Sequence, residues 1–338
     1  MASPSKLTDE RLTTVVESHP ADPSGWLVGP WFDSLLIANV AWPLAIVWQL
    51  GDGFSGRDGL QFWQVYFLTT PHRWITLALV FFDREQFGRR RTAFLLIAVA
   101  VALFCLSVRI TTGALTCLMT IHYVWNAWHF ASQHHGIYRI YYRRAGAVEG
   151  RAAAPTWVAL GLEKWTMRLF LLYVILRVAV ATWPYPTIEQ SLFWIDWMSL
   201  VIPTGLLLRQ NFMAGRATGA KIYLGSVCAL YVCLLGAVHF NDPALTLALA
   251  TASAIFHATE YLALISWSMR GKRSIPAERM GILSFFLPRF GLMLAMFMLI
   301  LGSFGWLLQK HWLQPWLVVN VIVAFLHYAY DGLIWRRR

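Results

Sequence analysis

The sequence predicts an all-α fold, a polytopic transmembrane helix bundle of about ten spans with both termini cytoplasmic. Of the 338 residues, 58% are hydrophobic and 13% are charged, and the mean hydropathy is +0.52. A soluble domain carries about twice that share of charged residues. Because a span needs about 20 apolar residues, the chain has room for roughly ten spans and no separate soluble domain.

Apolar runs between polar and Gly/Pro-rich stretches predict the spans. They cover 32–50, 60–82, 92–108, 112–132, 157–183, 191–208, 222–240, 244–268, 287–308 and 314–335. The fifth run is interrupted by charged residues, so an interfacial amphipathic helix leading into a shorter span also fits it. Residues 1–30 have no apolar core and are predicted to be a cytoplasmic N-terminal segment, which leaves 31–338 as a single transmembrane helical domain.

Clusters of Lys and Arg predict the orientation. They follow every second predicted span, as at 89–91, 143–144, 270–273 and 336–338, while the intervening loops carry little positive charge. The positive-inside rule then makes both termini cytoplasmic. The net charge of +11 is explained by this topology and by anionic membrane lipids, so no nucleic-acid partner is needed. We expect a multi-pass protein of a bacterial inner membrane.

Ionisable side chains lie inside these apolar runs, where Asp, Lys or Arg costs about 2.5–3.5 kcal/mol on insertion scales. Such residues usually mark a site or a pathway. The candidate metal ligands are His72, His129, His134, His135, His257, Glu260, His327 and Asp331. The four cysteines fall singly within predicted spans, and no pair has zinc-ribbon or redox spacing.

The fourth run contains the densest group. His122, Asn126, His129 and Gln133 share one stripe of a helix, which therefore faces protein or water and not lipid. His134 and His135 follow near the basic flank. A polar seam between packed helices is the alternative interpretation of this stripe.

Two further runs each pair a histidine with a carboxylate one turn away. His257 and Glu260 are three residues apart, and His327 and Asp331 are four apart. Either carboxylate could bind a metal or orient the imidazole, and either pair could be a plain buried hydrogen bond. His72 follows Pro71 in the second run and precedes Arg73. The alternative to a metal ligand at this position is a histidine that only packs in the core. We expect His239 in a loop at the opposite face and His311 at the surface.

Counting along the chain puts these groups at one depth. His72 lies 12 residues before Arg84, His129 lies 10 before Arg139, His257 lies 13 before Arg270 and His327 lies 9 before Arg336. At about 1.5 Å per residue these levels agree within roughly 6 Å. The predicted site therefore lies in the cytoplasmic half of the membrane, with His134, His135 and Asp331 closer to the cytoplasm.

Six histidines and two carboxylates exceed what one catalytic zinc needs, which is normally three protein ligands and a water. The surplus favours two metal ions. Nitrogen and oxygen ligands without thiolate suit non-haem iron, manganese or zinc. Glu260 and Asp331 are the candidate catalytic residues.

The segments HFASQHH (129–135), PHRW (71–74) and LHYAYDGLIWR (326–336) resemble motifs of histidine-rich integral membrane di-iron oxygenases. These include the fatty acid desaturase/hydroxylase type and the carotene-cleaving Brp/Blh family, although the desaturase boxes have tighter spacing. The resemblance implies O₂ activation at two iron ions and oxidation of a lipid or isoprenoid substrate that enters from the bilayer. It also implies an electron-donor protein as a partner.

Three other classes fit parts of the pattern. A zinc-dependent membrane hydrolase would use Glu260 or Asp331 as general base. A b-type haem protein would use two facing histidines but would leave the carboxylates unexplained. A proton-coupled transporter would also carry ionisable groups in its spans, usually with internal repeats.

Overall fold

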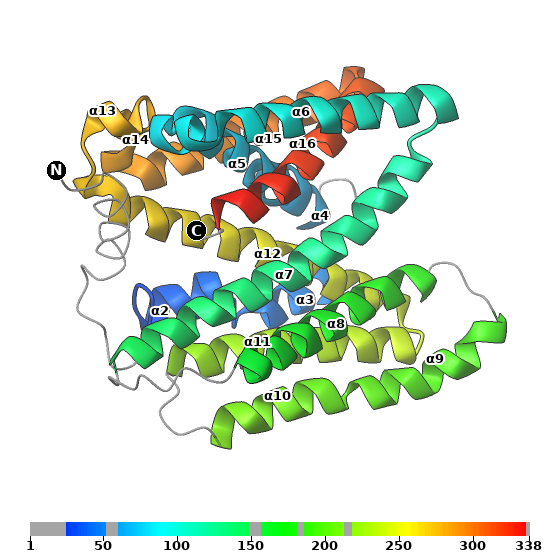
Figure 1. Ribbon diagram of the computed structural model, residues 1–338. Helices are drawn as coiled ribbons and strands as arrows, with labels where there is room; N and C mark the ends of the chain where they lie inside the picture. The colour runs from blue at the N-terminus through cyan, green and yellow to red at the C-terminus, as the bar shows by residue number, and fades with distance from the viewer. Residues whose placement is uncertain (1–24, 52–59, 149–156, 182–185, 213–217, 336–338) are drawn as a thin grey trace.

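The computed structural model describes residues 25–51, 60–148, 157–181, 186–212 and 218–335. Every regular element in these ranges is a helix (Figure 1). This confirms the all-α prediction. Most of the predicted N-terminal segment 1–30 lies outside the described residues.

Each predicted apolar run coincides with helical structure. In chain order the elements are α2 (Pro30–Phe32), η1 (Asp33–Ile37) and α3 (Trp42–Gly51); α4 (Leu60–Trp63), η2 (Gln64–Thr69) and α5 (Thr70–Phe82); α6 (Arg84–Thr112); α7 (Thr116–Val148); α8 (Trp157–Ala181); α9 (Pro186–Ser199) and α10 (Val201–Phe212); α11 (Thr218–His239); α12 (Pro243–Gly271); α15 (Phe290–His311); and α16 (Leu313–Ile334). Between α12 and α15 lie η3 (Lys272–Ser274), α13 (Ala277–Met280), α14 (Leu283–Phe286) and η4 (Leu287–Arg289).

Six of the described helices are long and apolar enough to cross a membrane, or seven if the bent pair 30–37 and 42–51 is one span. The two halves of that pair meet at 45°. The chain is therefore a multi-pass membrane protein. α7 and α8 are long but carry too many polar or charged residues to be among the six.

Two of the charges that interrupt the fifth predicted run form ion pairs inside the bundle. α8 is one continuous helix, and its Glu163 lies 2.8 Å from Arg209 on α10. Its Arg177 lies 3.4 Å from the buried Asp196 on α9. These pairs explain how a helix with several charged residues packs within an apolar bundle.

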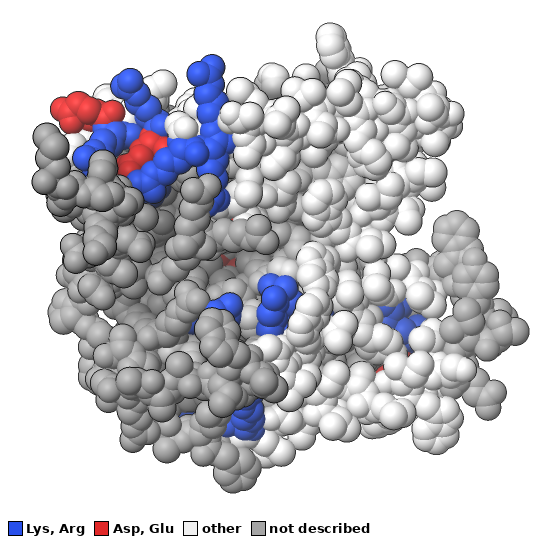
Figure 2. Space-filling model, in the orientation of Figure 1, with Lys and Arg blue, Asp and Glu red and all other residues white. Residues whose placement is uncertain are grey.

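One end of the bundle is strongly basic. Figure 2 shows Lys and Arg gathered at the upper left, around α13 and the start of α6, while uncharged side chains cover the upper right. Arg84, Arg89, Arg273 and Arg279 are exposed there. Asp83 accepts a hydrogen bond from the backbone N–H of Gln86 and so caps α6, and it also pairs with Lys272 at 2.7 Å.

α12 passes through the middle of the bundle (Figure 1), and 78% of its 18-residue apolar stretch is buried inside the protein. It packs against α3, α5, α11 and α15, while α16 packs against α5, α6 and α7. Four of these helices, α5, α7, α12 and α16, supply the candidate site.

A widened turn and a glycine set the position of α5. Pro71 has no N–H and its ring clashes with the carbonyl four residues earlier, and the preceding segment η2 is a π-helix. On the facing helix α15, a Cβ on Gly302 would lie 2.6 Å from the Phe67 ring and 2.8 Å from the Tyr66 carbonyl. Only glycine lets α15 pack this closely on the turn that leads into His72.

Candidate metal centre

Four histidines from four helices meet at the centre of the bundle. They are His72 on α5, His129 on α7, His257 on α12 and His327 on α16. Their ring centroids form a closed four-membered ring, with distances of 5.2 Å (72–257), 5.1 Å (257–129), 4.7 Å (129–327) and 5.0 Å (327–72). All four side chains are buried.

Six nitrogen atoms of these rings have no hydrogen-bond partner. Both nitrogens of His72 and His257, and Nε2 of His129 and of His327, are buried and unpaired. Leaving a buried polar group unsatisfied costs about 1–3 kcal/mol, and native proteins rarely do so. Neutral imidazole nitrogens with free lone pairs are metal ligands, so the donor set fits a metal ion.

The size of the ring also fits one ion. With sides of about 5 Å, the equidistant point lies about 3.1 Å from the centroids if the ring is folded into a tetrahedron and about 3.5 Å if it is flat. A metal bound to an imidazole nitrogen at about 2.1 Å lies about 3.2 Å from the ring centroid. The ring therefore has the size that one ion needs, and His72, His257 and His327 have ligand atoms within 4.8 Å of one another.

Asp331 stands at the edge of this ring. Its Oδ2 lies 3.8 Å from His129 Nε2. Two groups have ligand atoms within 4.8 Å of one another: His72, His257 and His327, and His129, His327 and Asp331. His327 is common to both groups, so Asp331 can approach an ion held by the histidines.

A second layer of polar side chains lies one turn beyond the histidines. Each histidine has a polar residue four positions later on its own helix: Thr76, Gln133, Tyr261 and Asp331. Tyr261 hydrogen-bonds both Thr76 and Asp331, so three helices contribute to one connected layer. On each of α5, α12 and α16 the histidine comes first and the polar residue follows one turn later. Because the histidines lie together and the polar residues lie together, these three helices run in the same direction, as the count of residues to each basic flank predicts.

This layer fixes the proton on His327. Tyr261 donates its only hydroxyl proton to Asp331 Oδ1 at 2.7 Å. Thr76 Oγ1, 2.6 Å from Tyr261 OH, must then donate to Tyr261. The remaining contact, 2.7 Å from His327 Nδ1 to Thr76 Oγ1, requires N–H on Nδ1. Nε2 of His327 is therefore left with a free lone pair.

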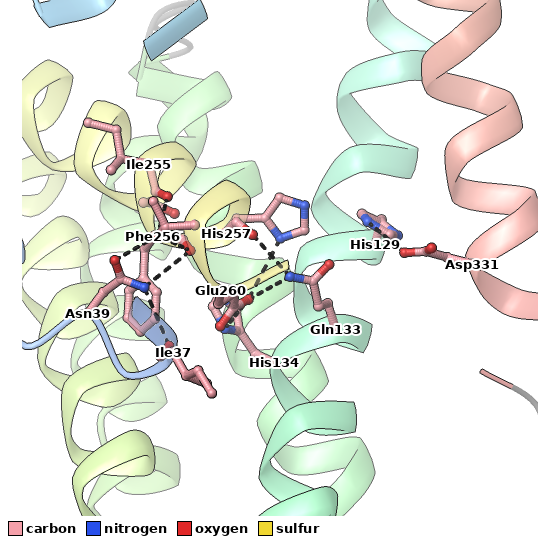
Figure 3. Close-up of polar contacts among 12 residues, drawn as sticks. Ile37, Asn39, His129, Gln133, His134, Ile255, Phe256, His257, Glu260 and Asp331 are labelled. Carbon is pink, nitrogen blue, oxygen red and sulfur yellow. Dashed lines mark hydrogen bonds and ion pairs between the residues drawn. The ribbon is translucent and has the colours of Figure 1, made fainter. Parts of the chain in front are cut away.

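Glu260 belongs to a hydrogen-bond network beside the histidine ring (Figure 3). Its carboxylate accepts hydrogen bonds from Gln133 Nε2 at 2.8 Å and Tyr223 OH at 2.9 Å. His134 Nδ1 lies 3.2 Å away, and His257 Nδ1 lies 3.9 Å away. Glu260 thus lies beside His257, close enough for its charge to act on the imidazole but too far for a hydrogen bond.

His134 and His135 lie outside the four-histidine ring. Both nitrogens of His134 contact tyrosine hydroxyls, Nδ1 with Tyr223 at 2.9 Å and Nε2 with Tyr231 at 3.4 Å. The charged neighbours of His135 are Arg168, Arg139 and Lys164. Helix geometry explains this, since steps of about 100° per residue turn positions 134 and 135 well away from His129.

The helix stripe predicted for α7 does face the interior. Tyr328 donates to Asn126 Oδ1 at 2.7 Å, and its hydroxyl lies 3.0 Å from His122 Nε2. His122 and Asn126 therefore form a polar group next to the ring. Arg73, which follows His72, has a buried Nε without a partner.

His239 does not lie in a loop as predicted, because it is the last residue of helix α11. Its side chain is 6% exposed, and its Nδ1 lies 3.0 Å from Asp196 Oδ2, with the rings of Phe193 and Trp197 close by. Asp196, on another helix, is the partner that the local sequence does not reveal. His311 ends α15 and is exposed, as predicted.

Comparison of the chain with protein-family models, with curated proteins and with solved structures gives no match.

Proposed function

We propose that this protein is a membrane-embedded non-haem metalloenzyme, an iron-dependent oxygenase, hydroxylase or desaturase that acts on a lipid or isoprenoid substrate. The observation that carries the proposal is the ring of four buried histidines with six unpaired nitrogens. Packing alone gives no reason to bury so many free lone pairs at one point.

The charges favour one ion. Only two carboxylates, Asp331 and Glu260, lie beside the four histidines in the described part of the chain. Together they balance one divalent ion, whereas two divalent ions would leave two positive charges uncompensated within the membrane. The second iron expected from the sequence would need the group of His129, His327 and Asp331, which shares His327 with the first.

The ligand number favours iron over zinc. Four protein ligands complete the tetrahedral shell of zinc, and catalytic zinc sites normally keep one position open. Non-haem iron accepts further ligands beside its protein donors and so leaves room for O₂. The alternative is a zinc-dependent hydrolase, and metal analysis of the purified protein distinguishes it from an iron-dependent oxygenase.

A haem would not fit between these rings. Two axial histidines must lie on opposite sides of a porphyrin plane. Any diagonal pair in this ring leaves the other two imidazoles, each about 5 Å from both, in that plane. The arrangement therefore supports a bare ion.

A bound iron ion would supply the activation of O₂ and one-electron chemistry on a C–H or C=C bond. The side chains have separate tasks. Four imidazoles would hold the ion, and Thr76 keeps the proton of His327 on Nδ1. Asp331 and Glu260 would balance the charge, Glu260 from the far side of His257. The low polarity of the bundle excludes bulk water, and a substrate dissolved in the bilayer already concentrates at this depth.

The proposal includes ten spans, cytoplasmic termini and a place in a bacterial inner membrane. The ten helical runs and the basic end of the bundle support it. An electron-donor protein would then reach the molecule at that basic end.

Metal analysis and an absorption spectrum of the purified protein test the function. We expect about one iron per chain, no Soret band, and loss of iron in His129→Ala, His257→Ala and His327→Ala. The matched control His311→Ala should keep its iron. Stoichiometric zinc would favour the hydrolase, and a Soret band would contradict the proposal.

A further inference from the structure

Arg73 places a cation at membrane depth, next to the histidine ring. It follows His72 on α5 and precedes the first basic flank by 11 residues, which is about 16 Å along a helix. Its side chain is half-buried, and its Nε is buried and unpaired. Among the described residues no carboxylate forms an ion pair with it. An arginine at this depth normally faces a pathway or a partner group.

The polar residues near Arg73 do not provide an anion. Arg73 is near enough to His72, His122, His129 and His327 for its charge to act on all four side chains. His122 and Asn126 both contact the hydroxyl of Tyr328, and neither carries a negative charge. They can donate or accept hydrogen bonds, but they cannot balance a guanidinium.

The charge count of the site leaves one positive charge. One divalent ion is balanced by Asp331 and Glu260. Arg73 then remains beside the ring without a carboxylate partner among the described residues, and a monoanion would complete the site.

We propose that Arg73 binds the carboxylate of a long-chain or isoprenoid acid and that such an acid is the substrate class of this site. A guanidinium matches a carboxylate with two parallel hydrogen bonds. A carboxylic acid can also take up a proton and reach this depth as a neutral molecule, whereas a phosphate headgroup stays charged at the interface. The inference rests on the metal centre proposed above.

The test is calorimetric titration of the purified, metal-loaded protein in neutral detergent at mildly alkaline pH. The probes are palmitate and hexadecanol, which have the same chain length and differ in the charged end. The wild-type protein should bind palmitate about 10- to 100-fold more tightly, the range of one charge-assisted contact. Equal affinity for the two probes would overturn the inference without any variant.

Substitutions of Arg73 test whether this residue causes the preference for palmitate over hexadecanol. Arg73→Gln should weaken palmitate binding to the level of hexadecanol, and Arg73→Lys should retain part of the preference because the charge remains. Arg168→Gln is the matched control, since Arg168 on α8 is also half-buried with an unpaired Nε, but it lies over the ring of Trp128 on α7. An unchanged preference in Arg73→Gln, or an equal loss in Arg168→Gln, would overturn the inference.

Metal content measured on the same samples separates the two proposals. Protein that carries iron but shows no preference for palmitate contradicts only the role of Arg73. Protein that never carries metal contradicts the proposed function itself.

Discussion

Each histidine of the ring has a polar residue four positions later on the same helix, and three of these residues, Thr76, Tyr261 and Asp331, form one connected hydrogen-bonded layer. For His327 this support can be followed atom by atom, through Thr76 and Tyr261 to Asp331. Outer partners of this kind fix the tautomer of a ligand and typically contribute 10- to 100-fold to metal affinity, so they matter nearly as much as the ligands.

Removing the hydroxyl of Tyr261 tests this support. Tyr261→Phe breaks the chain from Thr76 to Asp331, so the proton on His327 Nδ1 is no longer fixed. We expect metal affinity to fall about 10- to 100-fold in a competition assay with a chelator. The control is Tyr330→Phe, whose buried hydroxyl donates to the Phe94 carbonyl away from the ring. Equal affinities in the two variants would contradict the assigned role.

Asp331→Asn tests the charge of the carboxylate separately from its shape. The amide oxygen can still accept the hydrogen bond from Tyr261, so only the anion is lost. We expect metal affinity to fall about 10- to 100-fold while the melting temperature changes little. Asp83→Asn is the control, because asparagine caps a helix as well as aspartate. Unchanged metal binding in Asp331→Asn would remove the carboxylate from the centre.

At the scale of the elements, the ring depends on four helices that run in one direction and on the tight turn before α5. The π-helical turn before Pro71 and the small residue at Gly302 set the height of His72 relative to His257 and His327.

Gly302→Ala should push α15 away from this turn. The added Cβ would lie 2.8 Å from the Tyr66 carbonyl, which is backbone and cannot rotate away. We expect a loss of about 1–3 kcal/mol in stability, read as a lower melting temperature in detergent, together with weaker metal binding. Gly291→Ala on the same helix has nothing within 4 Å and should be neutral or slightly stabilising. If both substitutions behaved alike, the close approach would have no role.

Much of the ring could be predicted from the sequence, because depth along the membrane can be counted in residues. That count brings together His72, His129, His257 and His327. It places His134 and His135 only one or two turns away, so it does not exclude them as ligands, since depth says nothing of the direction in which a side chain points. The angle of about 100° per residue contains that information. The contacts of Tyr328 and Tyr223 join distant helices, and no local pattern predicts them.

At the scale of the whole molecule, the position of the ring depends on the topology. Basic residues gather at one end of the bundle, and the layers beyond the histidines lie toward that end.

Cysteine labelling tests this topology. Exposed Cys117 and Cys233 are first replaced by serine, since the other two cysteines are buried. Arg279→Cys and His311→Cys, which flank α15, should then react with a membrane-impermeant reagent from opposite sides, Arg279→Cys from the cytoplasm. Labelling of both from one side would contradict a membrane-crossing α15.

An X-ray absorption spectrum of the purified protein at the iron edge tests the metal centre most directly. One ion in the ring predicts a first shell of nitrogen and oxygen at about 2.0–2.2 Å with the outer-shell scattering of about four imidazoles. A sulfur shell, or a metal–metal vector at about 3.5–4 Å, would contradict a single ion held by His72, His129, His257 and His327.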